Sequence, residues 1–190
     1  MVKKKLILSG IFALMLLAAI QSVAEEKPPV EKCRQKIHEI RFGILSHDVD
    51  RLWSGSRKES GVDTNLEILF LRPTFSLGAG VVRPNLGFSL NDRNQTSKLY
   101  AGGLWEIRSQ FGAFLNLGLG MAVHDGALRI DGSGKKPLGA RVLFRVPIEV
   151  GVVLGRHHRL SLAFDHVSNA YLATPNNGMD TLGFRYGYIF

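Results

Sequence analysis

The stretch Gly112–His124, GAFLNLGLGMAVH, decides the fold that the sequence predicts. Apolar residues occupy every second position from Leu115 to Val123, and small or polar residues fill the positions between them. Because side chains alternate between the two faces of a β-strand, this pattern predicts a strand with one apolar face and one small or polar face. The segment Gly139–Leu154 repeats the pattern.

Eight segments of this kind follow residue 36, separated by clusters of Gly, Asn, Asp and Ser that are typical of turns. We expect strands near Ile37–His47, Val62–Leu71, Val81–Asn91, Ser97–Ile107, Gly112–His124, Gly139–Leu154, Arg159–Asn169 and Asp180–Phe190.

The apolar face of these strands has two possible environments. A water-soluble sandwich buries that face, whereas a membrane barrel turns it toward lipid and fills its lumen with small and polar residues. The segments are about ten residues or longer, as a tilted spanning strand requires. Their number is even, and short and long gaps alternate, except after the second and third segments. We therefore predict an all-β fold, an eight-stranded antiparallel transmembrane β-barrel over residues 37–190.

The two ends of the sequence favour export to a bacterial outer membrane. Residues 1–24 resemble a signal peptide, with Lys3–Lys5 before an apolar stretch and a small–x–small cleavage pattern at Ser22–Ala24. Residues 25–36 are expected to form a periplasmic arm. The terminal stretch Tyr186–Phe190 has an aromatic residue at every second position, which resembles the closing strand of outer-membrane barrels, although an ordinary aromatic strand is an alternative.

Charge and cysteine content exclude several classes of protein. The formal net charge is +8, but no basic run is interleaved with aromatic residues, so we expect a membrane surface as partner and no nucleic acid. The single cysteine, Cys33, cannot form a disulfide within the chain. His157 and His158 form a doublet without further ligands at zinc-site spacing, and neither a metal nor a cofactor is expected.

Three residues near the end of the chain have the side-chain types of a serine-hydrolase relay: Ser168, His166 and Asp180. His166 and Ser168 share the parity of the apolar set in the seventh segment, and Asp180 shares that of the eighth. All three are therefore expected on the lipid-facing side, at the loop end of two antiparallel neighbours. Ionisable groups are costly there, which makes them functional candidates, although interfacial polar residues at a strand end are the simpler alternative.

The motifs around these residues resemble those of a known family, the outer-membrane lipid A 3-O-deacylases (PagL-type). The resemblance rests on HVSNA at 166–170, PNNGMD at 175–180 and FGILSHD at 42–48. It implies hydrolysis of the ester-linked 3-hydroxyacyl chain at the 3-position of lipid A, with Ser168 as nucleophile, His166 as general base and Asp180 as orienting acid. The best-known member has Glu at the acidic position, one methylene longer than Asp180.

The same resemblance suggests where other groups act. Asn169, Asn176 and the loop backbone amides are candidates for stabilising the oxyanion. Lipid A or lipopolysaccharide is the expected partner, and basic residues near the outer rim are candidates for its phosphates, with solvated loop charges as the alternative: Arg51, Arg57, Arg93, Arg129, Lys135 and Lys136. A phospholipase of the same membrane and a non-catalytic structural barrel remain the competing interpretations.

Overall fold

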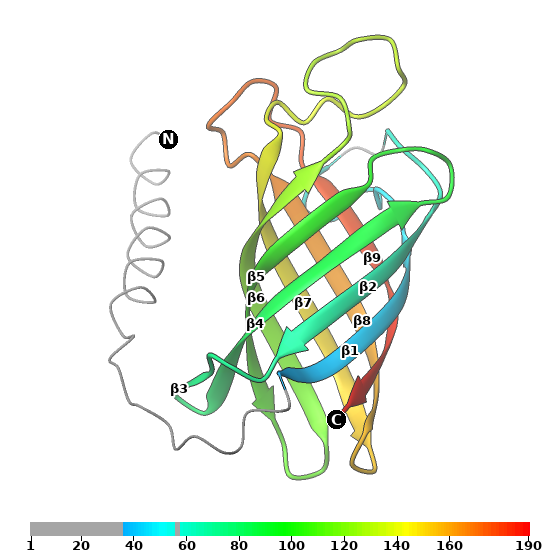
Figure 1. Cartoon of the computed structure of the whole chain (residues 1–190). Helices are drawn as coiled ribbons and strands as arrows, with labels where there is room; N and C mark the ends of the chain where they lie inside the picture. The colour runs from blue at the N-terminus through cyan, green and yellow to red at the C-terminus, as the bar shows by residue number, and fades with distance from the viewer. Residues whose placement is uncertain (1–35, 56–57) are drawn as a thin grey trace. The chain divides into compact units, whose positions relative to one another are not determined.

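A computed structural model describes residues 36–55 and 58–190 of the chain (Figure 1). The predicted signal peptide, 1–24, lies outside the described residues, as does all of the predicted arm except Lys36. Within the described ranges, no helix is both long and apolar enough to cross a membrane.

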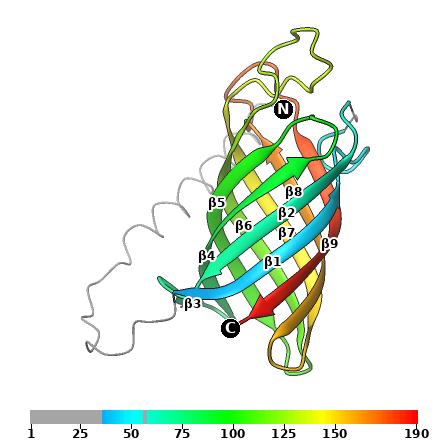
Figure 2. The ribbon, with the colours of Figure 1, turned by 45° about the vertical axis from the view of Figure 1, so that its right-hand side comes forward.

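Eight long antiparallel strands form a closed barrel, which confirms the predicted fold class (Figures 1 and 2). They are β1 (Ile37–Ser46), β2 (Val62–Phe70), β4 (Gly80–Asn91), β5 (Lys98–Arg108), β6 (Ala113–His124), β7 (Val142–Leu154), β8 (His158–Ser168) and β9 (Met179–Ile189). Each strand pairs with its neighbours along the chain, β1 pairs with β9, and β2 pairs with β4.

A ninth, short strand lies in the gap after the second predicted segment, one of the two gaps that do not fit the alternation of short and long gaps. β3 (Phe75–Leu77) pairs with the first residues of β4 and lies in the connection between β2 and β4. That connection, residues 71–79, lies at the end of the barrel where β1 begins and β9 ends, which we call the terminal end. The opposite, long-loop end carries residues 47–61, 92–97, 125–141 and 169–178.

The predicted alternation of faces is present in every long strand. In β6, Leu117, Met121 and Val123 are exposed on the outside, whereas Asn116 and His124 are buried in the lumen. Apolar residues thus surround the barrel and polar residues fill it, the reverse of a soluble sandwich.

The lumen is filled by a network of charged side chains. Arg41 donates hydrogen bonds to Glu39, Glu67 and Glu149, at 2.7–3.2 Å. Arg145 donates to Asp165 at 2.8 Å. Eight strands enclose an interior just wide enough for side chains, and this network packs that interior.

An apolar cluster closes the lumen at the long-loop end. Tyr100, Leu143, Val167 and Met179 point inward from four strands and pack around Leu138, which reaches in from loop 125–141. Val167 and Met179 are cross-strand partners in β8 and β9. The apolar cluster therefore lies on the lumen side of the wall, directly behind the predicted relay.

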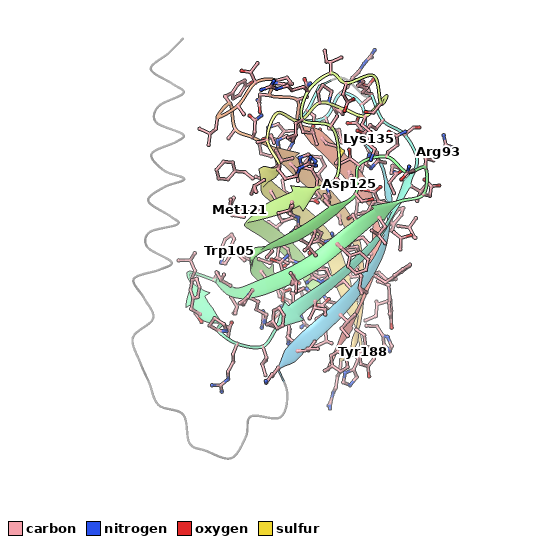
Figure 3. All side chains as sticks on the ribbon, turned by 45° about the horizontal axis from the view of Figure 1, so that its top comes forward. Arg93, Trp105, Met121, Asp125, Lys135 and Tyr188 are labelled. Atoms are coloured by element: carbon pink, nitrogen blue, oxygen red, sulfur yellow. The ribbon has the colours of Figure 1, made fainter. Side chains whose placement is uncertain are left out.

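The terminal end carries an aromatic belt on its outer surface. Tyr188 packs edge-on against Phe190 and stacks on His157. Tyr186 Oη and His158 Nδ1 form a hydrogen bond of 2.7 Å. Figure 3 shows Tyr188 at this end, far from Arg93, Asp125 and Lys135 at the other. Aromatic side chains at this level are typical of barrels at the membrane–water interface.

Candidate active site

The three predicted relay residues meet at the long-loop end of β8 and β9. His166 Nδ1 lies 2.6 Å from Asp180 Oδ1, and His166 Nε2 lies 3.1 Å from Ser168 Oγ. With Nδ1–H donating to the carboxylate, Nε2 is left to accept the hydroxyl hydrogen of Ser168. This is the order of contacts in which a carboxylate orients a base and the base activates a nucleophile.

The pairing of β8 with β9 accounts for this geometry. His166 and Asp180 are direct cross-strand partners, and such pairs place their Cβ atoms about 5 Å apart, so the short Asp side chain reaches the imidazole. Ser168 follows His166 by two residues and therefore lies on the same, outward face of β8.

A loop covers this outward site. His166 and Asp180 have the parity of the lipid-facing residues, yet they are only 6% and 0% exposed. The ring of Trp53, from loop 47–61, stacks on the His166 ring with centroids 4.5 Å apart and an interplanar angle of 11°. The sequence predicts all three groups on the lipid-facing side of their strands, and the loop lies over two of them.

The same loop binds the carboxylate of Asp180. The backbone N–H groups of Trp53 and Ser54 both donate to Oδ2 at 2.6 Å, leaving Oδ1 for His166. The backbone N–H of Val49 donates to the Asp180 carbonyl oxygen at 2.8 Å. Loop 47–61 is therefore joined to the relay by three backbone hydrogen bonds.

A buried polar cluster, which we call the loop anchor, holds the base of this loop. His47 lies 2.8 Å from both Glu59 and Asp63, through its two ring nitrogens. Burial alone lowers the pKa of His47, but the hydrogen bonds to Asp63 and Glu59 outweigh it and raise the pKa to about 9. Burial also opposes the ionisation of Glu59. The hydrogen bonds of Glu59 to His47, Lys136 and Thr96 outweigh this effect and lower the pKa of Glu59 to about 2.

The loop anchor also joins neighbouring loops. Thr96, from loop 92–97, donates to Glu59 through its backbone N–H and its hydroxyl, at 2.8 Å each. Lys136, from loop 125–141, lies 2.7 Å from Asp48 and donates to Glu59 through its backbone N–H. Three loops that are distant in sequence are thus held as one unit beside the relay.

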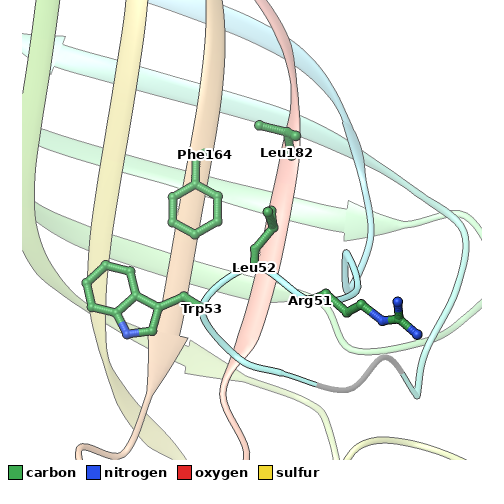
Figure 4. A pocket seen from close by; sticks show the side chains of 5 residues that line it. All are labelled: Arg51, Leu52, Trp53, Phe164 and Leu182. Atoms are coloured by element: carbon green, nitrogen blue, oxygen red, sulfur yellow. The ribbon is translucent and has the colours of Figure 1, made fainter.

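An open groove of about 690 Å³ runs along the outer surface beside the relay. Its lining comes from loop 47–61 and from the lipid-facing sides of β8 and β9: Arg51, Leu52, Trp53, Phe164 and Leu182 (Figure 4). The Arg51 side chain extends away from the four apolar ones. The groove can accommodate an apolar chain with a polar group at its end.

The structure gives the predicted oxyanion residues other contacts. Asn169 donates both amide hydrogens, to the carbonyl oxygens of Leu138 at 3.0 Å and Pro175 at 2.9 Å, and so ties loop 169–178 to loop 125–141. Asn176 is half-buried. Among the contacts of the described residues, neither amide bonds to a relay member.

The predicted phosphate-binding residues lie in different loops and differ in their exposure. Arg51 is exposed beside the groove, whereas Lys136 is 3% exposed and paired with Asp48, so it is not free at the rim. Arg93 and Arg129 are exposed in other loops. Arg57 lies outside the described residues.

Sequence reasoning missed Trp53 and Ser54. The one signal was Leu52-Trp53 within an otherwise polar loop, a pair of large apolar residues where solvation favours polar ones.

Comparison with known proteins adds a family and a fold. Residues 60–189 match a family model described as lipid A 3-O-deacylase (PagL). The crystal structure of the outer membrane enzyme PagL is similar, with a TM-score of 0.59 and 17% identity, covering 80% of this chain and 99% of that one. The Yersinia pestis outer membrane protein Ail in a phospholipid bilayer nanodisc has a TM-score of 0.47 and 12% identity, covering 82% and 100%. No curated protein sequence matches.

Proposed function

Because the chain belongs to the lipid A 3-O-deacylase (PagL) family, we propose that it hydrolyses the ester-linked 3-hydroxyacyl chain at the 3-position of lipid A with Ser168, His166 and Asp180. The observation that carries the mechanism is the continuous hydrogen-bond chain from Asp180 through His166 to Ser168 on the outward face of the barrel. The outer membrane, where this family of barrels resides, supplies both the substrate and the apolar surroundings.

The contacts order the chemical steps. Ser168 Oγ attacks the ester carbonyl carbon while His166 Nε2 takes the hydroxyl proton, and Asp180 stays ionised and steadies the imidazolium. The tetrahedral intermediate expels the 3-oxygen of the sugar, which receives the proton from His166. A water molecule, deprotonated by His166, then hydrolyses the acyl ester on Ser168 and releases the 3-hydroxy fatty acid.

The developing oxyanion needs hydrogen-bond donors close to Ser168. Because the Asn169 amide is committed to two carbonyl groups, we favour the backbone amides of the turn that follows it. Ala170 and Tyr171 have φ values of 52° and 66°, a left-handed conformation that non-glycine residues rarely adopt and that is concentrated at functional sites. Asn176 remains a further candidate donor.

The groove supports a lipid substrate that stays in the membrane. The scissile ester reaches Ser168 while its acyl chain lies along Leu52, Phe164 and Leu182, which line the groove. Among the described residues, Arg51 is the one cation that lines the groove, and we assign it to a phosphate of lipid A.

The test is mass spectrometry of lipid A from bacteria that express the chain or its Ser168→Ala variant at equal amounts of folded barrel. We expect lipid A to lose one 3-hydroxyacyl mass with the unmodified chain only. Phospholipids from the same cells are analysed in parallel. Lysophospholipid with intact lipid A would identify a phospholipase instead, and unchanged lipids of both kinds would identify a non-catalytic barrel.

A further inference from the structure

We propose that Trp53 is a positioning residue of the relay, which couples the occupied groove to the orientation of His166. The inference rests on the proposed function, because it assigns Trp53 a role in the reaction at Ser168. The segment that carries Trp53 precedes residue 60 and so lies outside the residues that the family model matches.

Trp53 sits at the apex of a tight, preformed turn. The backbone N–H of Arg51 donates to the Gly55 carbonyl oxygen at 2.7 Å, and both residues have left-handed φ values, 57° and 80°. Asp48 fixes the other side of the loop, because its Oδ2 accepts the backbone N–H groups of Lys58 and Glu59 at 2.7 and 2.9 Å. A turn held at both sides presents Trp53 in one position.

The indole spans the distance between the groove and the relay. Phe164 and His166 lie two residues apart on the outward face of β8, and Trp53 lies parallel to both rings, with interplanar angles of 5° and 11°. The centroid distances are 6.4 Å to Phe164 and 4.5 Å to His166. An acyl chain lying in the groove therefore contacts the same ring that covers the catalytic imidazole.

The stack restricts the motion of the His166 ring. Imidazole rotation about its side-chain bonds would break either the Asp180 or the Ser168 contact, and a flat ring packed on one face opposes that rotation. The backbone N–H groups of Trp53 and Ser54 also fix the Asp180 carboxylate in position relative to the His166 ring. Displacements of about 1 Å in such an arrangement can cost about 10²-fold in rate.

A kinetic experiment separates positioning from simple groove lining, with purified barrels and lipid A in detergent micelles. Trp53→Leu keeps the groove apolar but removes the flat ring, and we expect kcat to fall about 10²-fold with little change in KM. Trp53→Phe, which restores a flat ring, should recover most of this loss. Leu52→Ala removes groove surface only and should raise KM without lowering kcat. Trp53→Leu with raised KM and unchanged kcat would overturn the proposal.

A spectroscopic experiment tests the contact without any catalysis. In a Trp105→Phe background, Trp53 is the one tryptophan left, because the chain has two. Trp105 lies in β5 and donates to the Leu77 carbonyl, so the substitution removes this exposed hydrogen bond and touches no residue of the relay. The His166 ring covers one face of the Trp53 indole, so Trp53 fluorescence should change in His166→Ala, and it should stay the same in Ser168→Ala, which leaves the stack in place.

The two experiments distinguish failure of the inference from failure of the proposed function. If Trp53 fluorescence is unchanged in His166→Ala, the stacked pair does not exist and the inference is wrong, whatever the activity. If the fluorescence depends on His166 but lipid A stays intact with every variant, the proposed function fails, and with it the positioning role.

Discussion

Asp165 and His166 are consecutive residues of β8 that point to opposite sides of the barrel wall. Asp165 points into the lumen, where Arg145 Nε and Lys98 Nζ each lie 2.8 Å from its carboxylate. His166 points outward, where Asp180 and Ser168 bond to its ring nitrogens. Both side chains are almost fully buried, at 1% and 6% exposure, so burial alone does not tell a structural from a catalytic group.

The partners make the difference. Asp165 is paired with two cations, and its network continues through buried side chains that fill the lumen. The contacts of His166 end at the hydroxyl of Ser168, which is only half-buried, and the Trp53 ring that covers His166 also lines an open groove. A polar group on the lipid side is costly unless it is covered, and loop 47–61 supplies that cover. The polar network inside this barrel ends on buried partners, and the one on its outer face ends at a half-buried hydroxyl.

The largest effect is expected from His166→Ala, which should lower the deacylation rate at least about 10³-fold, since it removes the base that activates Ser168. The free energy of unfolding should stay nearly unchanged, because His166 packs outside the wall. The measurement is the rate of fatty acid release from lipid A micelles, with urea unfolding of the same samples. A variant that unfolds readily would show that the relay is part of the structural frame.

Asp165→Ala is the complementary substitution on the neighbouring residue. It should lower the free energy of unfolding by about 3–5 kcal/mol, because it leaves Lys98 buried without its anion and Arg145 with Glu67 alone. The activity per folded barrel should be retained. Urea titration in detergent measures the first quantity and fatty acid release the second. If activity is lost while stability is kept, the proposed division between lumen and outer face is wrong.

The strands and their faces were predictable because each depends on local alternation. Leu117 and Met121 of β6 face outward simply because their neighbours Asn116 and Ala122 fit the lumen. The meeting of His166 with Asp180 follows from the same parity and from the antiparallel pairing of two strands that are consecutive in the chain.

The cover of the site was not predictable, because it depends on contacts between distant residues. Trp53 reaches His166 across more than 100 residues of sequence, and its loop is held by a Lys136–Asp48 pair that spans 88. The commitment of Asn169 to Leu138 likewise depends on how loop 125–141 enters the barrel mouth. Nothing in local periodicity specifies such paths.

The length of the Asp180 side chain is the next feature of the outer face that can be tested. Asp180→Glu should lower kcat about 10- to 100-fold, because the added methylene moves the carboxylate off either His166 or the Trp53 and Ser54 N–H groups. Asp180→Asn is the control, since it keeps the length and removes the charge that fixes the imidazole tautomer. Both are compared by kcat at equal folded protein. An Asp180→Glu variant with full activity would show that the loop adapts to the longer side chain.

The smallest effect concerns pH and tests whether the loop anchor behaves like the lumen network. The pKa of His47 is raised from 6.5 to about 9, so its stabilisation is complete below pH 6.5 and is lost as the pH rises through about 9. The pKa of Glu59 is lowered from 4.5 to about 2, so its contribution is present above pH 4.5 and is lost as the pH falls through about 2. Between pH 7 and 8.5 the free energy of unfolding should fall by about 1–2 kcal/mol through His47.

His47→Gln should remove this fall, because its neutral amide nitrogen can donate to Glu59 or to Asp63 but the amide does not titrate. His157→Gln is the matched control, since His157 is exposed at the terminal end and its replacement should leave the pH profile of unfolding as it was. Urea titrations at several pH values measure both. A His47→Gln barrel whose stability still falls between pH 7 and 8.5 would place the titrating group elsewhere, and the loop anchor would then hold loop 47–61 by hydrogen bonds that do not depend on the charge of His47.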